Sequence, residues 1–235
     1  MSEKLLRVDN LTKRFGGFVA LDAVSLEIAE GERLGVIGPN GAGKSTLTNC
    51  ITGLLKPDGG RVHFGGRDIT FLPGHARARL GLARSFQLPR PFHSMTLAEN
   101  LAIPRDYAAR HDPPDPRDLL ARLGLGAKAD ALPRALTQIE LRKLELARAL
   151  AAQPRLVICD EAMAGLSHAE VDEMLAVLLR LNEGGIAILM IEHIMRAVMR
   201  FSQRIVVLDA GRKIADGAPA EILRDKEVER AYLGA

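Results

Sequence analysis

Aromatic residues are scarce in this chain, and tryptophan is absent. Phenylalanine, tyrosine and tryptophan together make up 4% of the 235 residues. Proteins that bind single-stranded nucleic acid without sequence preference stack the bases on aromatic rings. An excess of positive charge is also missing, because 32 basic residues face 29 acidic ones and the net charge is +3. Both shortages indicate that nucleic acid is not the partner of this protein.

Cysteine is rare as well, with only Cys50 and Cys159. Both lie in apolar segments, which predicts reduced thiols in the core rather than a disulfide or a metal site. No run of roughly 18 apolar residues occurs, so we expect no membrane-spanning helix. Residues 1–7 lack the apolar centre of a secretory signal. The hydrophobic residues, 47% of the chain, suffice for one large domain or a domain with a subdomain.

The most informative stretch fits the pattern of a glycine, any four residues and then Gly-Lys-Ser. Its members are Gly38, Pro39, Asn40, Gly41, Ala42, Gly43, Lys44, Ser45 and Thr46. An apolar run precedes it and a helix-like run follows, the context in which this pattern predicts a phosphate-binding loop. Glycines let successive N–H groups turn inward toward an anion, and the helix adds its positive N-terminal end.

Two side chains of this loop have specific roles in such a site. Lys44 would contact the β- and γ-phosphates of a nucleotide, and the Ser45 hydroxyl would hold Mg²⁺. The alternative is an ordinary glycine-rich turn before a helix. The agreement of strand, loop, Lys-Ser pair and helix favours the phosphate-binding interpretation.

Short apolar runs alternate with helical patterns over much of the chain. We expect a turn at 13–17 and a helix at 169–181. Fully apolar strands that alternate with helices predict a parallel sheet covered on both faces. The predicted strands are 5–8, 24–28, 61–64, 156–159, 186–191, 204–208 and 212–215.

The middle of the chain has a different character. Residues 84–92 are predicted to form a loop, because prolines interrupt them. Helical periodicity then appears at 118–125 and, most strongly, at 140–152. We therefore predict a helical subdomain inserted into a nucleotide-binding core. The boundaries are residues 1–87 and 153–235 for the core, with its antiparallel β region, and residues 88–152 for the helical subdomain.

Two carboxylates, Asp160 and Glu161, follow the apolar run at 156–159. The carboxyl end of a parallel strand faces the ligand crevice of an α/β sheet. Asp160 is therefore placed to hold Mg²⁺, directly or through water, and Glu161 suits a base that polarises an attacking water. A solvated Asp-Glu pair at a strand end is the alternative, and the phosphate loop weighs against it.

Three more residues are candidates for the same site. His193 follows the apolar strand at 186–191, so we expect it at the same sheet edge, where it can hydrogen-bond the γ-phosphate; an ordinary edge histidine is the alternative. Gln87 can reach Mg²⁺ or water through its amide oxygen, unless it is simply a loop residue. Phe15 can stack on adenine, or it can be a core phenylalanine.

Together these residues resemble the ATP-binding subunit of ABC transporters over essentially the whole chain. Phe15 matches the adenine contact, Gly38 to Thr46 match Walker A, and Gln87 matches the Q-loop. Asp160 and Glu161 match Walker B and the catalytic glutamate, and they precede a D-loop at 164–167 and a switch histidine at His193. The motifs occur in the family's order, with the helical segment in its usual place.

The resemblance implies a fold and a chemistry. The fold is α/β, a P-loop NTPase of ABC type with a mostly parallel core sheet, an N-terminal antiparallel β region and a helical subdomain. The ligands are ATP and Mg²⁺. The implied catalytic residues are Lys44, Gln87, Glu161 and His193, and the implied metal ligands are Ser45, Gln87 and Asp160.

The chain departs from the family where the signature loop, usually Leu-Ser-Gly-Gly-Gln, is expected. The matching residues are Leu136-Thr137-Gln138-Ile139-Glu140, so a hydroxyl is kept at Thr137 and both glycines are lost. In this family two ATPase subunits enclose two ATP molecules, and each signature contacts the nucleotide on the opposite subunit. The resemblance makes Thr137 such a contact. The lost glycines predict either a weak second ATP site or a loop that tolerates the changes.

Within the family the chain is most similar to importers of branched-chain and other hydrophobic amino acids, in phrases such as Arg14–Gly17 and Ala231–Gly234. The resemblance implies a second ATPase subunit, in a homodimer or a heterodimer, transmembrane permease subunits and, indirectly, a substrate-binding protein. It places the chain peripherally on the cytoplasmic face of the inner (plasma) membrane. The Gln87 loop and its apolar neighbours Leu88, Pro89, Pro91 and Phe92 would contact a permease helix.

Other interpretations remain open. The chain can serve a transporter of another substrate, or an exporter. It can be a soluble ABC ATPase of DNA repair or translation, although those add a coiled coil or a second ATPase copy. A P-loop kinase or GTPase acting alone is disfavoured, because the Asn-Lys-x-Asp guanine motif is absent and because Asp160-Glu161 together with His193 argues against both.

Overall fold

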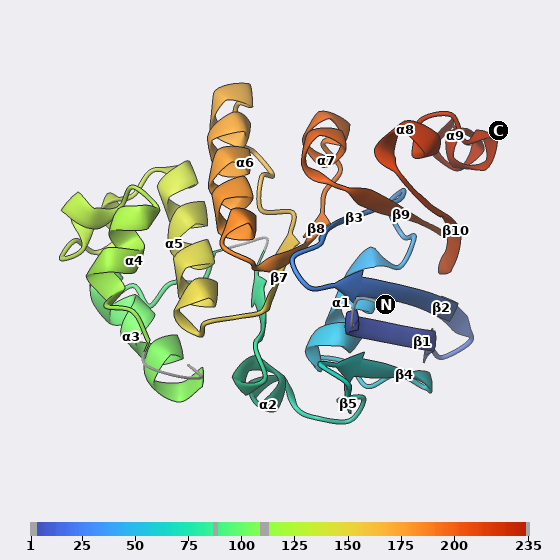
Figure 1. Cartoon of the computed structure of the whole chain (residues 1–235), viewed down its shortest axis with the longest axis horizontal. Coiled ribbons are helices and arrows are strands. Elements are labelled where there is room, and N and C mark those ends of the chain that lie inside the picture. Colours follow the sequence, from blue (N-terminus) through green and yellow to red (C-terminus); the bar gives the residue numbers. More distant parts are fainter. Residues whose placement is uncertain (1–3, 87–88, 109–112, 234–235) are drawn as a thin grey trace.

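The computed structural model describes residues 4–86, 89–108 and 113–233. Within them the strands are β1 (Lys4–Phe15), β2 (Phe18–Ala29), β3 (Arg33–Ile37), β4 (Gly59–Phe64), β5 (Arg67–Asp68), β6 (Leu82–Ser85), β7 (Leu156–Asp160), β8 (Ala187–Ile191), β9 (Arg204–Asp209) and β10 (Arg212–Gly217). The helices are α1 (Lys44–Thr52), α2 (Gly74–Arg79), α3 (Leu97–Ala108), α4 (Pro116–Arg122), α5 (Gln138–Ala151), α6 (His168–Glu183), α7 (Met195–Phe201), α8 (Pro219–Ile222) and α9 (Lys226–Leu233), with short 3₁₀ turns η1 (Gly126–Lys128) and η2 (Pro133–Ala135) (Figure 1).

The larger sheet has six strands in the order β10-β9-β3-β8-β7-β6. Neighbouring strands run parallel from β6 to β9, and the β9-β10 hairpin adds an antiparallel edge. A four-stranded antiparallel sheet, in the order β2-β1-β4-β5, carries the N-terminal part of the chain. This is the α/β fold with a mostly parallel core sheet and an antiparallel β region that the sequence predicts. The carboxyl ends of β3, β8, β7 and β6 therefore lie along one edge.

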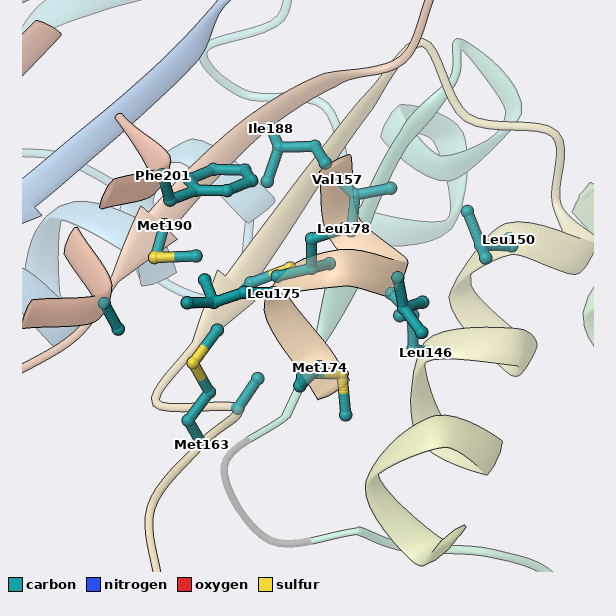
Figure 2. Close-up of a cluster of buried hydrophobic side chains, with 14 of the residues drawn as sticks. Leu146, Leu150, Val157, Met163, Met174, Leu175, Leu178, Ile188, Met190 and Phe201 are labelled. Carbon is teal, nitrogen blue, oxygen red and sulfur yellow. The ribbon is translucent and has the colours of Figure 1, made fainter. Parts of the chain in front are cut away.

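The central strands are apolar throughout because both faces of the parallel sheet are covered. Successive side chains point to opposite faces, so Val157 and Ile158 of β7 belong to different hydrophobic clusters. Figure 2 shows the cluster to which Val157 belongs, where Ile188 and Phe201 pack with leucines of α6. The other cluster lies between this sheet, α1 and the antiparallel sheet, and includes Leu47.

The helices α3, α4 and α5 pack against one another beside the larger sheet (Figure 1). Their buried leucines, Leu101, Leu120 and Leu144 among them, belong to the same cluster as Val157. Hydrophobic packing therefore continues from these helices to the sheet, and the division into core and helical subdomain stays a prediction. Among the described residues no helix has the length and apolar character needed to cross a membrane.

Several element boundaries differ from the expectation. Strand β1 continues to Phe15, which pairs with Phe18, so the turn consists of Gly16 and Gly17 rather than 13–17. Arg84 and Ser85 belong to a strand, because parallel pairing with β7 supplies backbone partners to a segment that has no β-branched residue. The helix expected at 118–125 begins instead at Pro116, with Asp115 as its N-cap, and ends at Arg122.

Cys50 and Cys159 are free and buried, as expected from the sequence. Burial raises the pKa of the Cys50 thiol to about 11 and that of Cys159 to about 12. A thiolate is the reactive form of cysteine, so both residues act as apolar core side chains at neutral pH.

Candidate nucleotide-binding site

Residues 38–43 form a tight loop between β3 and α1. Its shape requires glycine at two positions, because Gly38 and Gly43 have φ angles of 153° and 101°. A Cβ atom on Gly38 would lie 2.1 Å from the Leu208 carbonyl oxygen, and one on Gly43 would lie 2.6 Å from the Ala20 carbonyl oxygen. Helix α1 begins at Lys44, has no acidic residue in its first turn and has no side-chain cap. Its first backbone N–H groups therefore have no side-chain partner in a cap, and this end of the helix is suited to binding an anion.

The Lys44 side chain folds back over this loop. Its ammonium donates hydrogen bonds to the carbonyl oxygens of Gly38, at 2.6 Å, and Pro39, at 2.9 Å. Burial lowers the pKa of Lys44, and the carboxylates of Glu161 and Asp160 oppose that shift. The loop lysine and the two carboxylates from the end of β7 therefore lie within electrostatic reach of one another, as the sequence predicts.

Asp160 is the last residue of β7 and is only 6% exposed. Its Oδ2 accepts a hydrogen bond from Nη2 of Arg84 at 2.5 Å. A buried carboxylate needs a positive partner, and here a guanidinium provides the charge. The Asp160 carboxylate is therefore ionised and paired with a cation, which is consistent with its predicted role as a metal ligand.

A magnesium ion fits this donor set. Proteins bind Mg²⁺ beside nucleotides through one or two side-chain oxygens, and phosphates and water complete the octahedron. Asp160 supplies a carboxylate, and Ser45 supplies a hydroxyl in the first turn of α1. The described residues contain no group of three or more His, Cys, Asp or Glu side chains arranged to hold a metal by themselves.

Glu161 follows directly and has an unusual backbone. Its φ angle is +48°, a left-handed conformation that residues other than glycine seldom adopt. Its N–H donates to the carbonyl oxygen of Ile191, the last residue of β8, at 2.9 Å. Such conformations are concentrated at functional sites, where the surrounding structure enforces them. This hydrogen bond brings Glu161 to the end of the strand that leads to His193.

His193 lies two residues after β8 and is exposed. Glu192, just before it, is 1% exposed, and its Oε1 accepts a hydrogen bond from the Met163 N–H at 2.8 Å. Burial raises the pKa of Glu192. The segments that follow β7 and β8 are therefore joined beside the candidate site, and His193 is placed at the sheet edge where the sequence predicts it.

Phe15 is an exposed residue at the end of β1, not a core phenylalanine. Its side chain is 48% exposed, and the Lys13 ammonium lies 5.5 Å from the ring centroid. A cation over an aromatic face is a favourable contact, and the exposed ring remains suited to stacking on a planar base. Gln87 lies outside the described residues, and so does Leu88.

Thr137 belongs to a different part of the molecule, the N-terminus of α5. Its hydroxyl accepts from the Glu140 N–H, while its own N–H donates to Oε2 of Glu140 at 2.9 Å. Nζ of Lys128 lies 2.6 Å from the other oxygen of Glu140. These reciprocal bonds form a capping box. The Glu140 carboxylate therefore lies at the N-terminus of α5, where an external anion would otherwise bind. The Thr-x-x-Glu spacing of Thr137 and Glu140 is the sequence signal for this cap.

A groove of about 350 Å³ lies between α1, α2, β6, α3 and α5. Leu54, Phe86 and Pro104 give it an apolar lining, and Arg84 and Arg148 contribute positive charge. The exposed Tyr107 ring, on α3, lies next to Ala108, a lining residue. Sequence patterns did not identify this groove, because its walls come from five separate elements.

Two further contacts escaped the sequence analysis. Arg84 was assigned to a loop, and no local pattern marks it as the partner of Asp160. Tyr232 of α9 hydrogen-bonds with the backbone of Gly38, and burial raises its pKa. The C-terminal helix therefore contacts the candidate phosphate loop, across almost two hundred residues of sequence.

Comparison with known proteins gives a consistent result. The family described as ABC transporter matches residues 21–164, and the family described as branched-chain amino acid ATP-binding cassette transporter matches residues 212–235. The high-affinity branched-chain amino acid transport ATP-binding protein LivG of Salmonella typhimurium is 40% identical, over 100% of this chain and 99% of its own. The lipopolysaccharide export system ATP-binding protein LptB of Acidithiobacillus ferridurans is 37% identical, over 100% of this chain and 98% of its own.

Solved structures agree with these similarities. The ADP conformation of MJ1267, an ATP-binding cassette of an ABC transporter, has a TM-score of 0.89 at 32% identity and covers 100% of both chains. This chain is therefore similar to a nucleotide-binding cassette over its full length. It also has the glycine loop and the strand-end carboxylates described above.

Proposed function

This chain belongs to the ABC transporter family of ATP-binding proteins and is an ATPase, and from that membership we propose that it powers the uptake of branched-chain or related hydrophobic amino acids. The hydrolytic part is supported by one observation, the placement of the loop before Lys44 and of Asp160 and Glu161 at the carboxyl ends of strands in the same parallel sheet. The import part is supported by the match of residues 212–235 to a branched-chain amino acid family. LptB is named for export at 37% identity, so service to an exporter is the second candidate.

The hydrolysis follows from the geometry of the sheet edge. The loop at 38–46 holds the phosphates of ATP through backbone N–H groups, and Lys44 exchanges its carbonyl partners for phosphate oxygens. Phe15 stacks on the adenine. Ser45, Asp160 and Gln87 would hold Mg²⁺, and the ion would supply positive charge against the phosphates.

The reaction itself requires a base and a charge-stabilising group. Glu161 accepts a hydrogen bond from the attacking water and holds it in line with the γ-phosphorus. His193, at the end of the adjacent strand, donates to the γ-phosphate and stabilises the spreading charge. The left-handed backbone of Glu161 and its N–H bond to Ile191 hold the main chain at the end of β8, and a base on a fixed main chain needs less reorganisation during the reaction.

ABC ATPases of transporters act together with transmembrane permease subunits, and we assign the permease contact of this chain to the groove beside β6. An apolar lining between two packed helical segments suits an inserted helix. Phe92, one of the apolar residues predicted to contact a permease helix, is 41% exposed. The guanidinium carbon of Arg148 lies 5.1 Å from the centroid of its ring. The chain would then be held peripherally on the cytoplasmic face of the membrane, and a substrate-binding protein would act through the permease.

The second ATPase subunit is proposed to be a different chain. The N-terminus of α5 is closed by Glu140, and Ile139 takes the place of a glycine. In a pair of identical chains both signatures would have this defect. In a heterodimer, a partner with an intact signature would complete the site formed by Lys44 and Glu161, and the site that faces Thr137 would hydrolyse ATP slowly.

The test is reconstitution with the membrane proteins that co-purify with this chain. Proteoliposomes should take up labelled leucine in an ATP-dependent manner, and a leucine-loaded binding protein should raise the ATPase rate. ATP hydrolysis without any effect of hydrophobic amino acids, together with stimulation by another substrate, would replace the proposed substrate. Nucleic acid instead of a membrane protein in the purified complex would remove the transport function altogether.

A further inference from the structure

The Arg84 guanidinium contacts three elements that surround the candidate metal site. Nη2 donates to Oδ2 of Asp160 on β7, and Nη1 donates to Oδ1 of Asn49 on α1 at 2.7 Å. The guanidinium carbon also lies 5.1 Å from the centroid of the Phe86 ring. The side chain is 11% exposed. A single buried cation therefore joins the strand-end carboxylate, the helix of the phosphate loop and the first residue after β6.

If magnesium binds at Asp160, the ion and the Arg84 guanidinium would both neutralise the same carboxylate. Asp160 is the residue assigned to Mg²⁺ above, so the inference rests on that part of the proposed function. In the described structure its carboxylate is paired with Arg84. A divalent ion close to the same oxygens repels the guanidinium and shares the negative charge with it. A metal at Oδ2 would therefore compete with Arg84 for that oxygen, and a metal at Oδ1 would still weaken the pair by charge repulsion.

We propose that Arg84 is an internal counter-ion that occupies Asp160 in the metal-free protein and yields it, wholly or in part, when the magnesium–nucleotide complex binds. The ion pair prevents an unpaired buried charge in the empty protein, which would be costly. Asn49 gives the guanidinium a second acceptor that does not depend on Asp160. Arg84 is thus a positioning residue, and it acts on the reaction through Asp160.

Phe86 extends this exchange to the groove. Both Arg84 and Phe86 line that groove, so a guanidinium that leaves Asp160 alters the wall on which a permease helix is proposed to dock. The coupling has to be reciprocal. A partner that draws Arg84 toward the groove frees Asp160 and strengthens metal binding. Metal occupancy and partner binding are then linked through one side chain.

The first experiment measures Mn²⁺, as a probe for Mg²⁺, by electron paramagnetic resonance in the ADP-loaded full chain. Arg84→Met should bind Mn²⁺ more tightly, by about fivefold or more, the lower end of typical coupling between sites. Arg84→Lys keeps the charge and should stay close to the wild type. The matched control is Arg79→Met, because Arg79 is an exposed cation on α2 that donates a hydrogen bond to the Tyr107 carbonyl oxygen and not to Asp160. Unchanged or weaker Mn²⁺ binding in folded Arg84→Met would overturn the proposal.

Asp160→Asn separates this inference from the proposed function. It should weaken Mn²⁺ binding strongly. If it does so while Arg84→Met has no effect, the counter-ion role is wrong and the metal assignment stands. If Asp160→Asn leaves Mn²⁺ affinity unchanged, the metal assignment is wrong and the inference falls with it.

The second experiment keeps Arg84 intact and so does not depend on the stability of its variants. The chain contains no tryptophan, so Phe86→Trp places the protein's single tryptophan beside the guanidinium, and excitation at a wavelength that tyrosine does not absorb reports on it alone. Addition of Mg²⁺ to the ADP-loaded protein should change the tryptophan emission, and the same addition to the Phe86→Trp, Arg84→Met double variant should not. An emission that ignores Mg²⁺ while Arg84 is present, or that responds equally without it, would overturn the proposal.

Discussion

The Lys44 ammonium donates a hydrogen bond to the Gly38 carbonyl oxygen at 2.6 Å, so the lysine of the candidate phosphate loop is held by its own loop. The bond keeps a partly buried charge satisfied until phosphate oxygens replace the carbonyl. Substitution of Lys44 is therefore the most direct test of ATP binding at this loop.

Lys44→Met should weaken ATP binding. A hydrogen bond to a charged group contributes about 1.5–3 kcal/mol, which corresponds to roughly a 10- to 150-fold rise in the Kd. The check is isothermal titration with Mg-ATP, next to Lys56→Met, which removes an exposed lysine outside the loop. Equal affinity of the wild type and Lys44→Met would contradict the assigned phosphate site.

Glu161→Gln should separate binding from turnover. The amide keeps the size of the side chain but cannot accept a proton, and loss of a general base lowers rates by about 10²- to 10⁴-fold. We expect an unchanged Kd for ATP and almost no phosphate release. Glu183→Gln, at the exposed end of α6, is the matched control and should turn over normally. Normal turnover of Glu161→Gln would exclude Glu161 as the base.

Local patterns were sufficient for the parts of the site that are continuous in sequence. The loop at 38–46 is recognised from its glycines and from Lys44, and Asp160 from its position after an apolar strand. The contacts of Arg84 join residues 35 and 76 positions away, and no local spacing encodes them. Strand β6 was missed for the same reason, since its pairing with β7 and not its own residues makes it a strand.

The N-terminus of α5 shows a second limit of prediction from sequence. Thr137 was assigned from its hydroxyl alone, and the reciprocal bonds with Glu140 were overlooked although the spacing was present. Lys128, which pairs with that glutamate, comes from η1, ten residues before α5. The charge balance at the helix end is therefore set by tertiary packing, which brings Lys128 to Glu140.

The two buried thiols should make the protein sensitive to alkali. An unfolded cysteine loses its proton near pH 9, whereas folded Cys50 keeps it to about pH 11 and Cys159 to about pH 12. Between these values the native state binds more protons than the unfolded state, so the free energy of unfolding falls as pH rises. Urea titrations from pH 8 to pH 11 should show this fall.

The control for that effect is the Cys50→Ala, Cys159→Ala double variant, whose unfolding free energy should fall less steeply over the same range. A thiol reagent at pH 8 should leave the native wild type unmodified and modify both cysteines after denaturation. Rapid modification of the native protein would show that one of these side chains is accessible.

The closed N-terminus of α5 leads to a prediction for the assembled transporter. Ile139→Gly restores the small residue at the signature, and Glu140→Gln removes the carboxylate that would repel a γ-phosphate. The double variant should raise the ATPase rate, because the site that faces Thr137 becomes able to bind phosphate through its backbone N–H groups. Ile139→Ala is the control, since it removes side-chain bulk without the backbone freedom of glycine.

A cost accompanies this change and must be measured with it. Ile139 is 8% exposed, and glycine within a helix costs about 1 kcal/mol relative to alanine, so thermal unfolding of each variant has to show a folded protein. An unchanged ATPase rate in a folded double variant would mean that the native loop already serves its site. The partner would then not need a different signature, and a homodimer would be as consistent with the site as a heterodimer.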